Sequence, residues 1–395
     1  MKKCLNNWDH VFIFGTTPTP RMLDRVRVAI HAGCRVAVVV TIRQEEHVQM
    51  EEIQGCDIFF RRVGYKGVSL LRLFALPHAF FWLQRNLRNR INAKTIIHTD
   101  CLDLLSVAQI VFRAKGARYH HQVRDLHALQ MGKGLASSIV RTIDKKMMHG
   151  VSMLMLTCQR FYDDYYKKIY NGKYVIVENW PDYHIWENFK RRNTEEFVIA
   201  YIGIVRYLDC LKALIASLDS IQALGHPVRL KLAGGGDTVR IKEMIGSRKW
   251  IDFTGPFSYV DEVLELYEDV DLIWSVYDTS FKNVQLAMPN KFYESKLARI
   301  PIIVASQTYL SSRVHEDGIG IDVECTNSED ILIKLLDALK GSGWYQLAIQ
   351  NLSEIDAEHY LTTEHPKRIR TAIFGPEEHP KTTSLRHFEE NQAVA

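Results

Sequence analysis

A short segment of the chain, residues 288 to 306, combines polar and apolar residues in an order suited to binding an anion. It reads MPNKFYESKLARIPIIVAS, so that Pro-Asn-Lys comes before a helical stretch and an apolar strand follows. A helix N-terminus favours negative charge, and a carboxylate such as that of Glu294 can accept hydrogen bonds from two neighbouring hydroxyl groups. The segment therefore suggests a site for a ligand that carries both anionic and hydroxyl groups.

Two further segments in the second half of the chain carry groups of the same kind. Arg206 follows the apolar run 196–203, and Gly235 lies in the Gly-Gly-Gly turn 234–236 after the next run. Arginine presents a planar set of donors that suits phosphate oxygens, and glycines let the backbone approach a ligand closely. A single arginine is more often a solvated charge, and such a turn is more often a plain connection. Their order and spacing together favour a site for a diphosphate and a sugar.

The elements that must position these residues follow the alternation of βα units around parallel sheets. Strands are predicted in the first half at 10–15, 35–40, 57–63, 95–100, 118–123, 152–157 and 174–179, and in the second half at 196–203, 228–234, 251–255, 271–277, 301–306 and 318–323. Helices are predicted near 20–33, 69–91, 102–115, 135–149, 159–170, 208–224, 238–246, 260–268, 290–299 and 328–340.

This pattern predicts an α/β protein with two Rossmann-like, doubly wound domains that face one another across a cleft. The expected boundaries are a first domain at 1–181, a second domain at 182–355 that carries the candidate diphosphate and sugar site, and C-terminal helices with a tail at 356–395, whose return to the first domain is left open. In open α/β sheets ligands bind beyond the carboxyl ends of the strands. The residues just after each strand are therefore the candidates for chemistry.

The charge of the chain is unevenly distributed between these domains. Residues 1–181 hold 27 Lys and Arg against 14 Asp and Glu, which is +13, and the remainder holds 23 against 32, which is −9. Such a split favours an anionic partner for the first domain, and the alternative is an ordinary solvated surface. The seven cysteines are scattered without a Cys-x-x-Cys pair, so we expect reduced thiols.

Four segments of the second half resemble the donor-side blocks of retaining GT-B glycosyltransferases of family 4. They read YIGIVRYLDCLKALIASL, LKLAGGGD, IDFTGPFSYVDEVLELYEDVDLIWSVYD and PNKFYESKLARIPIIVAS. The resemblance extends from about residue 10 to 340, and Pro-Asn-Lys-x-x-Glu is its most specific part. It implies transfer of a sugar from a UDP- or GDP-sugar co-substrate to a glycan or lipid-linked acceptor in bacterial surface polysaccharide synthesis, with no further cofactor and no metal.

The resemblance assigns roles to individual donor-side residues. Arg206 would bind the diphosphate and stabilise the charge of the leaving group, Glu294 would bind the ribose hydroxyls, and Asn290 and Lys291 would begin a helix beside the diphosphate or sugar. In such retaining enzymes the leaving phosphate is thought to accept the proton of the acceptor. A dedicated general base is therefore not required, and charge stabilisation is the main catalytic term.

The chain departs from the family pattern at two donor-side positions. The Glu that the family commonly has eight residues before the ribose Glu is Leu286 here, so that Asn283 or Gln285 would have to replace it. The family also has a Lys five or six residues after the Arg. The count gives Lys212, whereas alignment of the following helix puts Asp209 there, and both alternatives stay open.

In the first half, four residues follow strands that resemble those of the acceptor domain. Gly15 ends the first strand, where it would let a loop approach the donor or simply form a turn. Arg124, Asp125 and His127 follow the run 118–123, and each is a candidate to orient the attacking hydroxyl group. Asp125 is the predicted catalytic residue of this group. The alternative is that Arg124 and Asp125 only pair with each other.

Two patterns that suggest metal ligands have simpler explanations. Glu-Asp-Val-Asp at 268–271 contains an Asp-x-Asp, but Asp271 leads directly into an apolar strand and is expected to mark its start. His120 and His121 are neighbours in a predicted strand, so their side chains point to opposite faces. We expect no metal site.

The segment 68–90 has an unusual composition, because it is aromatic and basic and contains no acid. It reads VSLLRLFALPHAFFWLQRNLRNR, in which Pro77 is expected to kink or divide a helix. It suits docking onto anionic lipid headgroups, and the alternative is a buried helix with a solvated last turn. With no signal peptide or membrane-spanning run, we expect a cytoplasmic protein, peripheral on the membrane if the segment docks.

Two other classes of function fit parts of the pattern. A nucleotide-sugar epimerase or hydrolase would use the same architecture without an acceptor. A nucleic-acid-binding protein would use the basic first half, but the −9 charge of the second half opposes that partner. A glycosyltransferase accounts for both halves of the chain.

Overall fold

The computed structural model describes residues 7–43, 53–63, 69–341 and 343–376, and these form two compact units. The first unit takes its described residues from 1–124, 133–177 and the segment that begins at His365. The second unit consists of 125–132 and 178–364. The sequence placed the boundary at Pro181, close to the observed start of the main part of the second unit at Glu178. The predicted tail beyond residue 376 lies outside the described residues.

The first unit is built on a parallel sheet whose described strands follow the order β3-β2-β1-β4-β5-β6-β7. The strands are β1 (His10–Phe14), β2 (Val36–Arg43), β3 (Cys56–Val63), β4 (Ile96–Thr99), β5 (Arg118–Val123), β6 (Met153–Leu156) and β7 (Lys173–Ile176). Its helices are α1 (Pro20–His31), α2 (Ser69–Asn86), α3 (Leu102–Phe112), α5 (Leu135–Met148), α6 (Gln159–Asp164) and α17 (His365–Phe374), with short 3₁₀ turns at Arg88–Arg90, Arg113–Lys115 and Tyr166–Lys168.

The second unit has its own parallel sheet, whose described strands follow the order β10-β9-β8-β11-β12-β13. The strands are β8 (Phe197–Ile202), β9 (Val228–Ala233), β10 (Ile251–Gly255), β11 (Leu272–Ser275), β12 (Ile302–Ala305) and β13 (Gly320–Val323). The helices are α4 (Ala128–Met131), α7 (Tyr183–Trp186), α8 (Leu208–Ala223), α9 (Thr238–Ile245), α10 (Tyr259–Tyr267), α11 (Lys282–Leu286), α12 (Asn290–Ala298), α13 (Tyr309–Asp317), α14 (Ser328–Leu339), α15 (Trp344–Glu354) and α16 (Ala357–His359), followed by a π-helical turn at Tyr360–Glu364.

Both sheets are parallel because the helical connections run back along the sheet, so that each new strand starts at the same end as the last. The central strands are buried on both faces, which is why they read as continuous apolar runs instead of alternating ones. Val38, Val39 and Val40 of β2 have no exposed surface, and neither have Ile302 and Ile303 of β12. The fold class, two doubly wound α/β domains, is confirmed.

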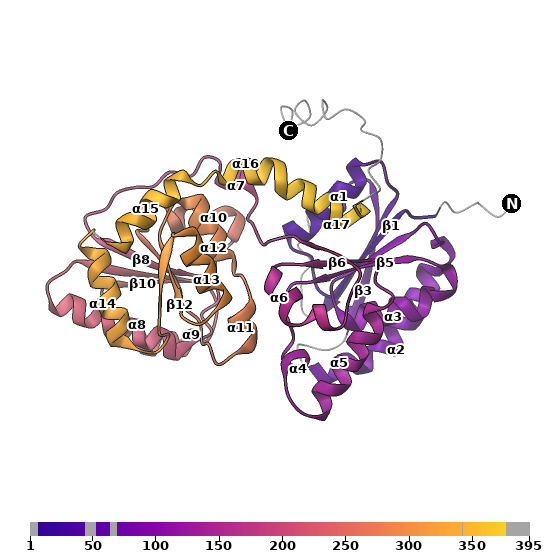
Figure 1. Ribbon diagram of the computed structural model, residues 1–395, viewed down its shortest axis with the longest axis horizontal. Helices are drawn as coiled ribbons and strands as arrows, with labels where there is room; N and C mark the ends of the chain where they lie inside the picture. The colour runs from indigo at the N-terminus through magenta and orange to yellow at the C-terminus, as the bar shows by residue number, and fades with distance from the viewer. Residues whose placement is uncertain (1–6, 44–52, 64–68, 342, 377–395) are drawn as a thin grey trace. The chain divides into compact units, whose positions relative to one another are not determined.

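The C-terminal helix α17 belongs to the first unit. It packs on α1, β6 and β7, as Figure 1 shows for its position beside α1. Ile373 and Phe374 join the apolar cluster that contains Phe12 and Val38. The backbone oxygen of Ala372 accepts a hydrogen bond from His120 Nδ1 at 2.9 Å. The end of the described chain therefore covers part of the first sheet.

Helix α2 corrects one prediction about the aromatic and basic segment 68–90. Residue 68 lies outside the described residues, and the helix runs from Ser69 to Asn86 with Pro77 inside it, so Pro77 does not divide it. Ala79, Leu83 and Leu87 are buried, whereas Phe81 is exposed. Most of its described apolar residues therefore face the first unit, as the buried-helix alternative requires.

The pairing of β11 with β12 gives a test of the second core. Ile303 is fully buried and lies opposite Trp274, so Ile303→Ala removes buried methyl groups and leaves a cavity. We expect a loss of about 2–5 kcal/mol in the free energy of unfolding, measured by chemical denaturation with tryptophan fluorescence. Ile333→Ala is the matched control, because Ile333 is 52% exposed and its loss should cost about 0.5 kcal/mol or less. Equal losses of stability in the two variants would contradict the burial of Ile303 in the second core.

Candidate functional site

Three loops at the carboxyl edge of the second sheet are joined to one another through their backbones. Gly203 N donates to Ala233 O at 2.7 Å, and Gly234 N donates to Gly255 O at 2.7 Å. A Cβ atom on Gly234, whose φ is +142°, would lie 1.9 Å from the carbonyl oxygen of Gly203. Only glycine allows this approach. The predicted Gly235 lies in the same turn, where its carbonyl accepts from Val205 N at 2.8 Å.

Glu294 lies in α12 next to this edge, and its side chain is completely buried. Its Oε1 accepts a hydrogen bond from the Tyr259 hydroxyl at 3.0 Å, and its Oε2 accepts from the Tyr267 hydroxyl at 2.7 Å. Lys291 Nζ lies 2.5 Å from the same Oε2. A buried carboxylate needs such partners, because an unpaired charge is costly to remove from water. Burial and the charge of Glu294 raise the pKa of Tyr267 well above its usual value.

The Lys291 side chain connects Glu294 to the glycine loops. A Cβ atom on Gly203 would lie 3.6 Å from Lys291 Cε, so this side chain passes directly over the loop after β8. Its ammonium group also lies 5.8 Å from the ring centroid of Tyr267. The predicted residues Lys291 and Glu294 therefore lie together, and they do so as partners of each other.

Arg206 is exposed at the end of β8, beside a group of aromatic residues. Its guanidinium group pairs with no carboxylate among the described residues. Tyr207 packs against Tyr277 and Phe281, with ring centroids 5.6 and 5.7 Å apart. Burial raises the pKa of Tyr277 to about 12, and the charges of Glu294 and Arg206 act on it in opposite directions. The two predicted donor-binding residues Arg206 and Glu294 therefore both lie near Tyr277.

The helices that begin at this edge differ in how their first turns are occupied. The first turn of α8 contains Asp209, and that of α10 contains Asp261 and Glu262. Asp237 caps α9 by accepting from Arg240 N at 3.2 Å. In α12 no acidic residue lies in the first turn and no side chain caps it. Of these four helices, α12 is the one whose first turn has neither an acidic residue nor a capping side chain to oppose an anion.

The predicted replacements for the missing donor-side residues are occupied elsewhere. Leu286 is buried, Asn283 donates to Asp125 Oδ1 at 3.1 Å, and Gln285 donates to Thr279 O at 2.8 Å. Lys212 and Asp209 are both exposed on α8, so the choice between them as the counterpart of the family Lys stays open.

In the first unit, Gly15 and Arg124 both contact Asp100, which follows β4. Gly15 N donates to Asp100 Oδ1 at 2.9 Å, and Arg124 Nη2 lies 3.1 Å from Asp100 Oδ2. A Cβ atom on Gly15 would lie 2.6 Å from Cys101 Sγ, which gives this glycine a packing reason. The alternative in which Arg124 pairs with Asp125 is wrong, because Asp100 takes that place.

Asp125 and His127 belong to the short segment 125–132 of the second unit. Asp125 is exposed and is held by Asn283, whose Oδ1 also accepts from Leu126 N at 3.1 Å. His127 caps α4, because its Nδ1 accepts from Leu129 N at 3.2 Å. The sequence grouped both residues with Arg124 as acceptor-side candidates, whereas the structure assigns them to a different unit from Arg124.

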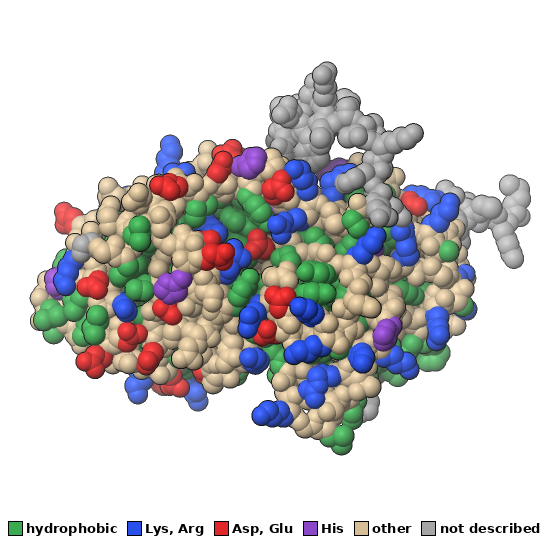
Figure 2. All heavy atoms as spheres, viewed as in Figure 1, with side chains coloured by type: hydrophobic (Ala, Val, Ile, Leu, Met, Phe, Trp, Pro, Cys, Tyr) green, Lys and Arg blue, Asp and Glu red, His purple; other side chains and the backbone are tan. Residues whose placement is uncertain are grey.

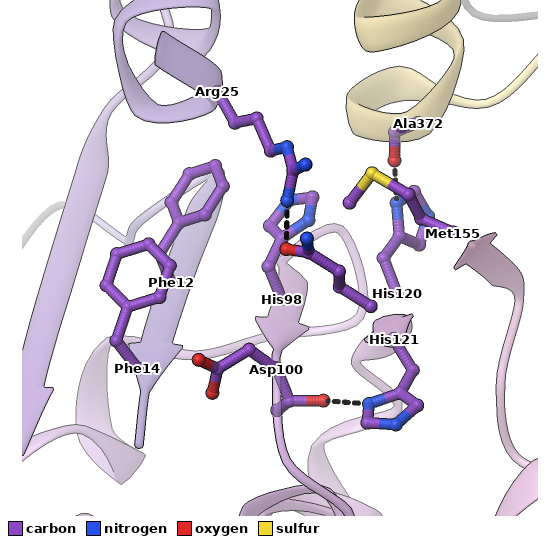
Figure 3. A pocket seen from close by; sticks show the side chains of 11 residues that line it. Phe12, Phe14, Arg25, His98, Asp100, His120, His121, Met155 and Ala372 are labelled. Atoms are coloured by element: carbon purple, nitrogen blue, oxygen red, sulfur yellow. Dashed lines mark hydrogen bonds between the residues drawn. The ribbon is translucent and has the colours of Figure 1, made fainter. Parts of the chain in front are cut away.

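The first unit also contains a buried cluster of histidines that the sequence patterns did not reveal. Figure 3 shows Arg25 reaching down from α1 toward the histidines His98, His120 and His121. Arg25 donates to Gln122, and these residues line a cavity of about 20 Å³. That volume holds about one water molecule. Burial lowers the pKa of Arg25 to about 10, with the charge of Arg124 acting in the same direction. No motif joins these residues, since they come from α1 and two separate strands.

The two patterns that suggested metal ligands have structural partners instead. Asp271 accepts from Val198 N at 2.9 Å and pairs with Arg191 at 2.7 Å, and Asp269 pairs with Lys231. As predicted, Asp271 directly precedes β11. His120 bonds to Ala372, and His121 bonds to Thr99 Oγ1 at 2.9 Å. Within the part of the chain that the structure describes, no three His, Cys, Asp or Glu residues gather as metal ligands.

No protein-family model matches the chain, and no curated protein matches it either. Solved structures do. A sucrose-phosphate synthase from Thermosynechococcus elongatus matches with a TM-score of 0.66 at 10% identity, covering 92% of this chain and 98% of that chain. A glycosyltransferase from Rickettsia africae matches with a TM-score of 0.63 at 13% identity, covering 93% and 98%. HepE from Anabaena, in complex with UDP, matches with a TM-score of 0.62 at 12% identity, covering 92% and 99%.

The chain has the GT-B glycosyltransferase fold. At these identities the likeness establishes the fold alone, and the finer resemblance to family 4 stays a prediction. The GT-B fold accounts for the two parallel sheets, each with candidate residues at its carboxyl edge.

The two tyrosines on Glu294 give a test of its buried network. Tyr267→Phe leaves Oε2 without one donor in a site that water does not reach, so we expect a loss of about 1.5–3 kcal/mol in the free energy of unfolding. Tyr259→Phe should cost less, because Tyr259 is half-buried and water can replace its hydroxyl group. Chemical denaturation of both variants checks this order. A larger loss for Tyr259→Phe would contradict the geometry.

The buried histidines of the first unit predict a loss of stability in acid. Burial lowers the pKa of His98 well below its usual value and lowers those of His121 and His365 to about 4. As the pH falls below about 6.5, these histidines bind protons in the unfolded chain but stay neutral in the folded chain. The free energy of unfolding therefore decreases. Each of these histidines should remove about 1.4 kcal/mol per pH unit from there until its folded pKa is reached.

Denaturation of the full chain between pH 7.5 and pH 5 measures this slope. His121→Gln should reduce it, because glutamine keeps a polar group beside Thr99 but does not titrate. The exposed His226→Gln is the control and should leave the slope unchanged. A wild-type stability that is flat over this range would contradict the prediction.

Proposed function

We propose that the chain is a retaining glycosyltransferase that moves a sugar from a UDP- or GDP-sugar to a hydroxyl group of a glycan or lipid-linked acceptor. One observation carries the proposal. At the carboxyl edge of the second sheet, Arg206, which pairs with no described carboxylate, and the acid-free N-terminus of α12 accompany loops built from glycine backbone. These are the groups that a nucleotide diphosphate requires. The Anabaena structure with this fold contains UDP, which supports the choice of ligand.

The leaving group in this proposal is the nucleoside diphosphate. The acceptor oxygen bonds to the anomeric carbon while the bond from that carbon to the diphosphate oxygen breaks, and the acceptor proton passes to the departing diphosphate. Negative charge grows on the diphosphate during this step. Arg206 and the first amides of α12, at Asn290 and Lys291, stabilise that charge, which is usually the largest catalytic term.

Glu294 binds the ribose in this proposal, and Tyr259 takes the place of a ribose hydroxyl when no donor is bound. Tyr259 is only half-buried and donates to Oε1, whereas Tyr267 and Lys291 occupy Oε2 from the interior. A ribose hydroxyl can therefore replace the Tyr259 hydroxyl without leaving Glu294 unpaired. The buried carboxylate of Glu294 would then keep its hydrogen-bond partners both with and without the donor.

The acceptor side of the proposal is supported by charge. Residues 1–181 carry a net +13, which suits a lipid-linked acceptor at the cytoplasmic surface of an anionic membrane, as in bacterial surface polysaccharide synthesis. Asp125, held by Asn283, is the candidate that orients the attacking hydroxyl group.

Among the described residues, no helix combines the length and the apolar composition that a membrane span requires.

A nucleotide-sugar epimerase or hydrolase is the second candidate, because the same donor-side groups would serve it. The two differ in their need for an acceptor. Turnover of a nucleotide sugar to free sugar or epimer at an undiminished rate without acceptor would favour the second candidate.

Substitution of Arg206 tests the proposed donor site. After a thermal-shift screen of nucleotide sugars has identified the donor, Arg206→Met should lower kcat for transfer about 10²–10³-fold, because the leaving group loses its main cation. Arg240→Met is the matched control, since Arg240 is an exposed arginine that pairs with Asp237 on α9. We expect kcat of that variant to stay within about twofold of the wild type.

Glu294→Gln should weaken the donor-induced thermal shift in the same series. If Arg206→Met and Glu294→Gln both kept wild-type kinetics, the donor would not bind at the carboxyl edge of the second sheet. The absence of a thermal shift with every nucleotide sugar would remove the proposed class of donor.

A further inference from the structure

Helix α5 of the first unit buries a mixed face and exposes a row of aliphatic residues. Ser137, Asp144 and Met148 are buried, and the Tyr165 hydroxyl donates to Asp144 Oδ2 at 2.8 Å. Leu135, Ile139 and Ile143 are 79%, 52% and 43% exposed. A helix of a soluble protein normally turns its apolar side inward. In α5 Met148 does so, whereas this row of aliphatic residues stays at the surface.

The three exposed aliphatic residues form a continuous apolar stripe along α5. They are four residues apart, so each lies one turn above the last, and the stripe is about 12 Å long. Scattered exposed aliphatic residues need no explanation, but a row of three on one helix face marks a surface that contacts something apolar.

Basic residues accompany this stripe, and no acid on the helix opposes them. Lys133, Lys145 and Lys146 are exposed and have no ion-pair partner among the described residues. From 133 to 150 the only acidic residue is Asp144, which is fully buried. Figure 2 shows basic and hydrophobic side chains over the part of the first unit where Figure 1 places α5.

We propose that α5 docks the protein on a lipid bilayer with anionic headgroups. The stripe enters the boundary between headgroups and acyl chains, and the lysines remain at the level of the phosphates. This combination of an apolar face and flanking lysines is the one that interfacial helices use. The proposal does not depend on the donor site, which lies in the other unit.

The lysines of this surface favour an anionic bilayer over a second copy of the chain as its partner. A two-fold dimer would place the same face against itself, and so would bring the lysines of two copies together. No exposed acid on α5 could compensate for them. An anionic surface satisfies the stripe and the lysines at the same time.

Helix α2, which the sequence favoured for this role, is less suited to it. Arg90, just beyond its end, pairs with Asp57 at 2.8 Å and lies 3.9 Å from the ring centroid of Trp8. Leu83 and Leu87 face the interior. Of the described apolar side chains in 75–86 only Phe81 and Pro77 are exposed, and Arg85 follows them on the same face, so this part of α2 offers a smaller apolar surface than the three aliphatic residues of α5.

Co-sedimentation of the full chain with vesicles tests the proposal. We expect binding to vesicles of phosphatidylglycerol and phosphatidylcholine, with little binding to phosphatidylcholine alone. Combined Leu135→Ser, Ile139→Ser and Ile143→Ser should weaken the binding at least about tenfold, because the apolar contact is lost. Each of Lys145→Gln and Lys146→Gln should weaken it about fivefold, less so at high salt.

The control changes equally exposed aliphatic residues of the second unit, Val239, Ile333 and Leu347, to serine. That variant should bind as the wild type does. All variants should keep the thermal midpoint and the donor-induced thermal shift of the wild type, which separates this test from the test of the donor site.

Three results would overturn the proposal. One is a wild-type chain that does not bind anionic vesicles, and another is undiminished binding by the α5 serine variant. The third is a concentration-dependent dimer in light scattering that the serine substitutions dissociate, which would make the stripe an interface between copies.

Discussion

The buried carboxylate of Glu294 is the constraint around which the carboxyl edge of the second sheet is organised. It has no exposed surface, so its charge exists only because Lys291, Tyr267 and Tyr259 provide partners. These partners tie α12 to α10 and bring the Lys291 side chain over Gly203. The cost of an unpaired buried charge therefore fixes where α12 begins.

The position of α12 determines what the carboxyl edge of the second sheet can bind. The neighbouring helices α8, α9 and α10 carry acids in or beside their first turns, and α12 does not. At the end of β8, Arg206 is exposed and no carboxylate in the described part of the chain pairs with it. Positive potential is thus concentrated at one part of a domain whose sequence is acidic, which suits a dianionic ligand and disfavours a polyanion.

The first unit distributes its charge differently. Its buried polar groups, among them His98, His121 and Arg25, lie beneath α1 and α17, where burial keeps the histidines neutral. Lys145 and Lys146 of α5 are exposed and accompany the exposed row of Leu135, Ile139 and Ile143. In both units buried carboxyl groups accept from tyrosine hydroxyls, Asp144 from Tyr165 and Glu294 from Tyr267.

The sequence by itself determined the strands, the two parallel sheets and the segment Asn290–Glu294, because strand periodicity and helix starts are local properties of the chain. It did not reveal α13 or α15, nor which groups Arg124 and Glu294 contact, and it predicted C-terminal helices within 356–395 without deciding that α17 joins the first unit. Asp100 replaces Asp125 as the partner of Arg124, and α5 leaves Leu135, Ile139 and Ile143 exposed. Only the tertiary structure decides such pairings, because partners for a buried charge come from elements far apart in the chain, and no local pattern records them.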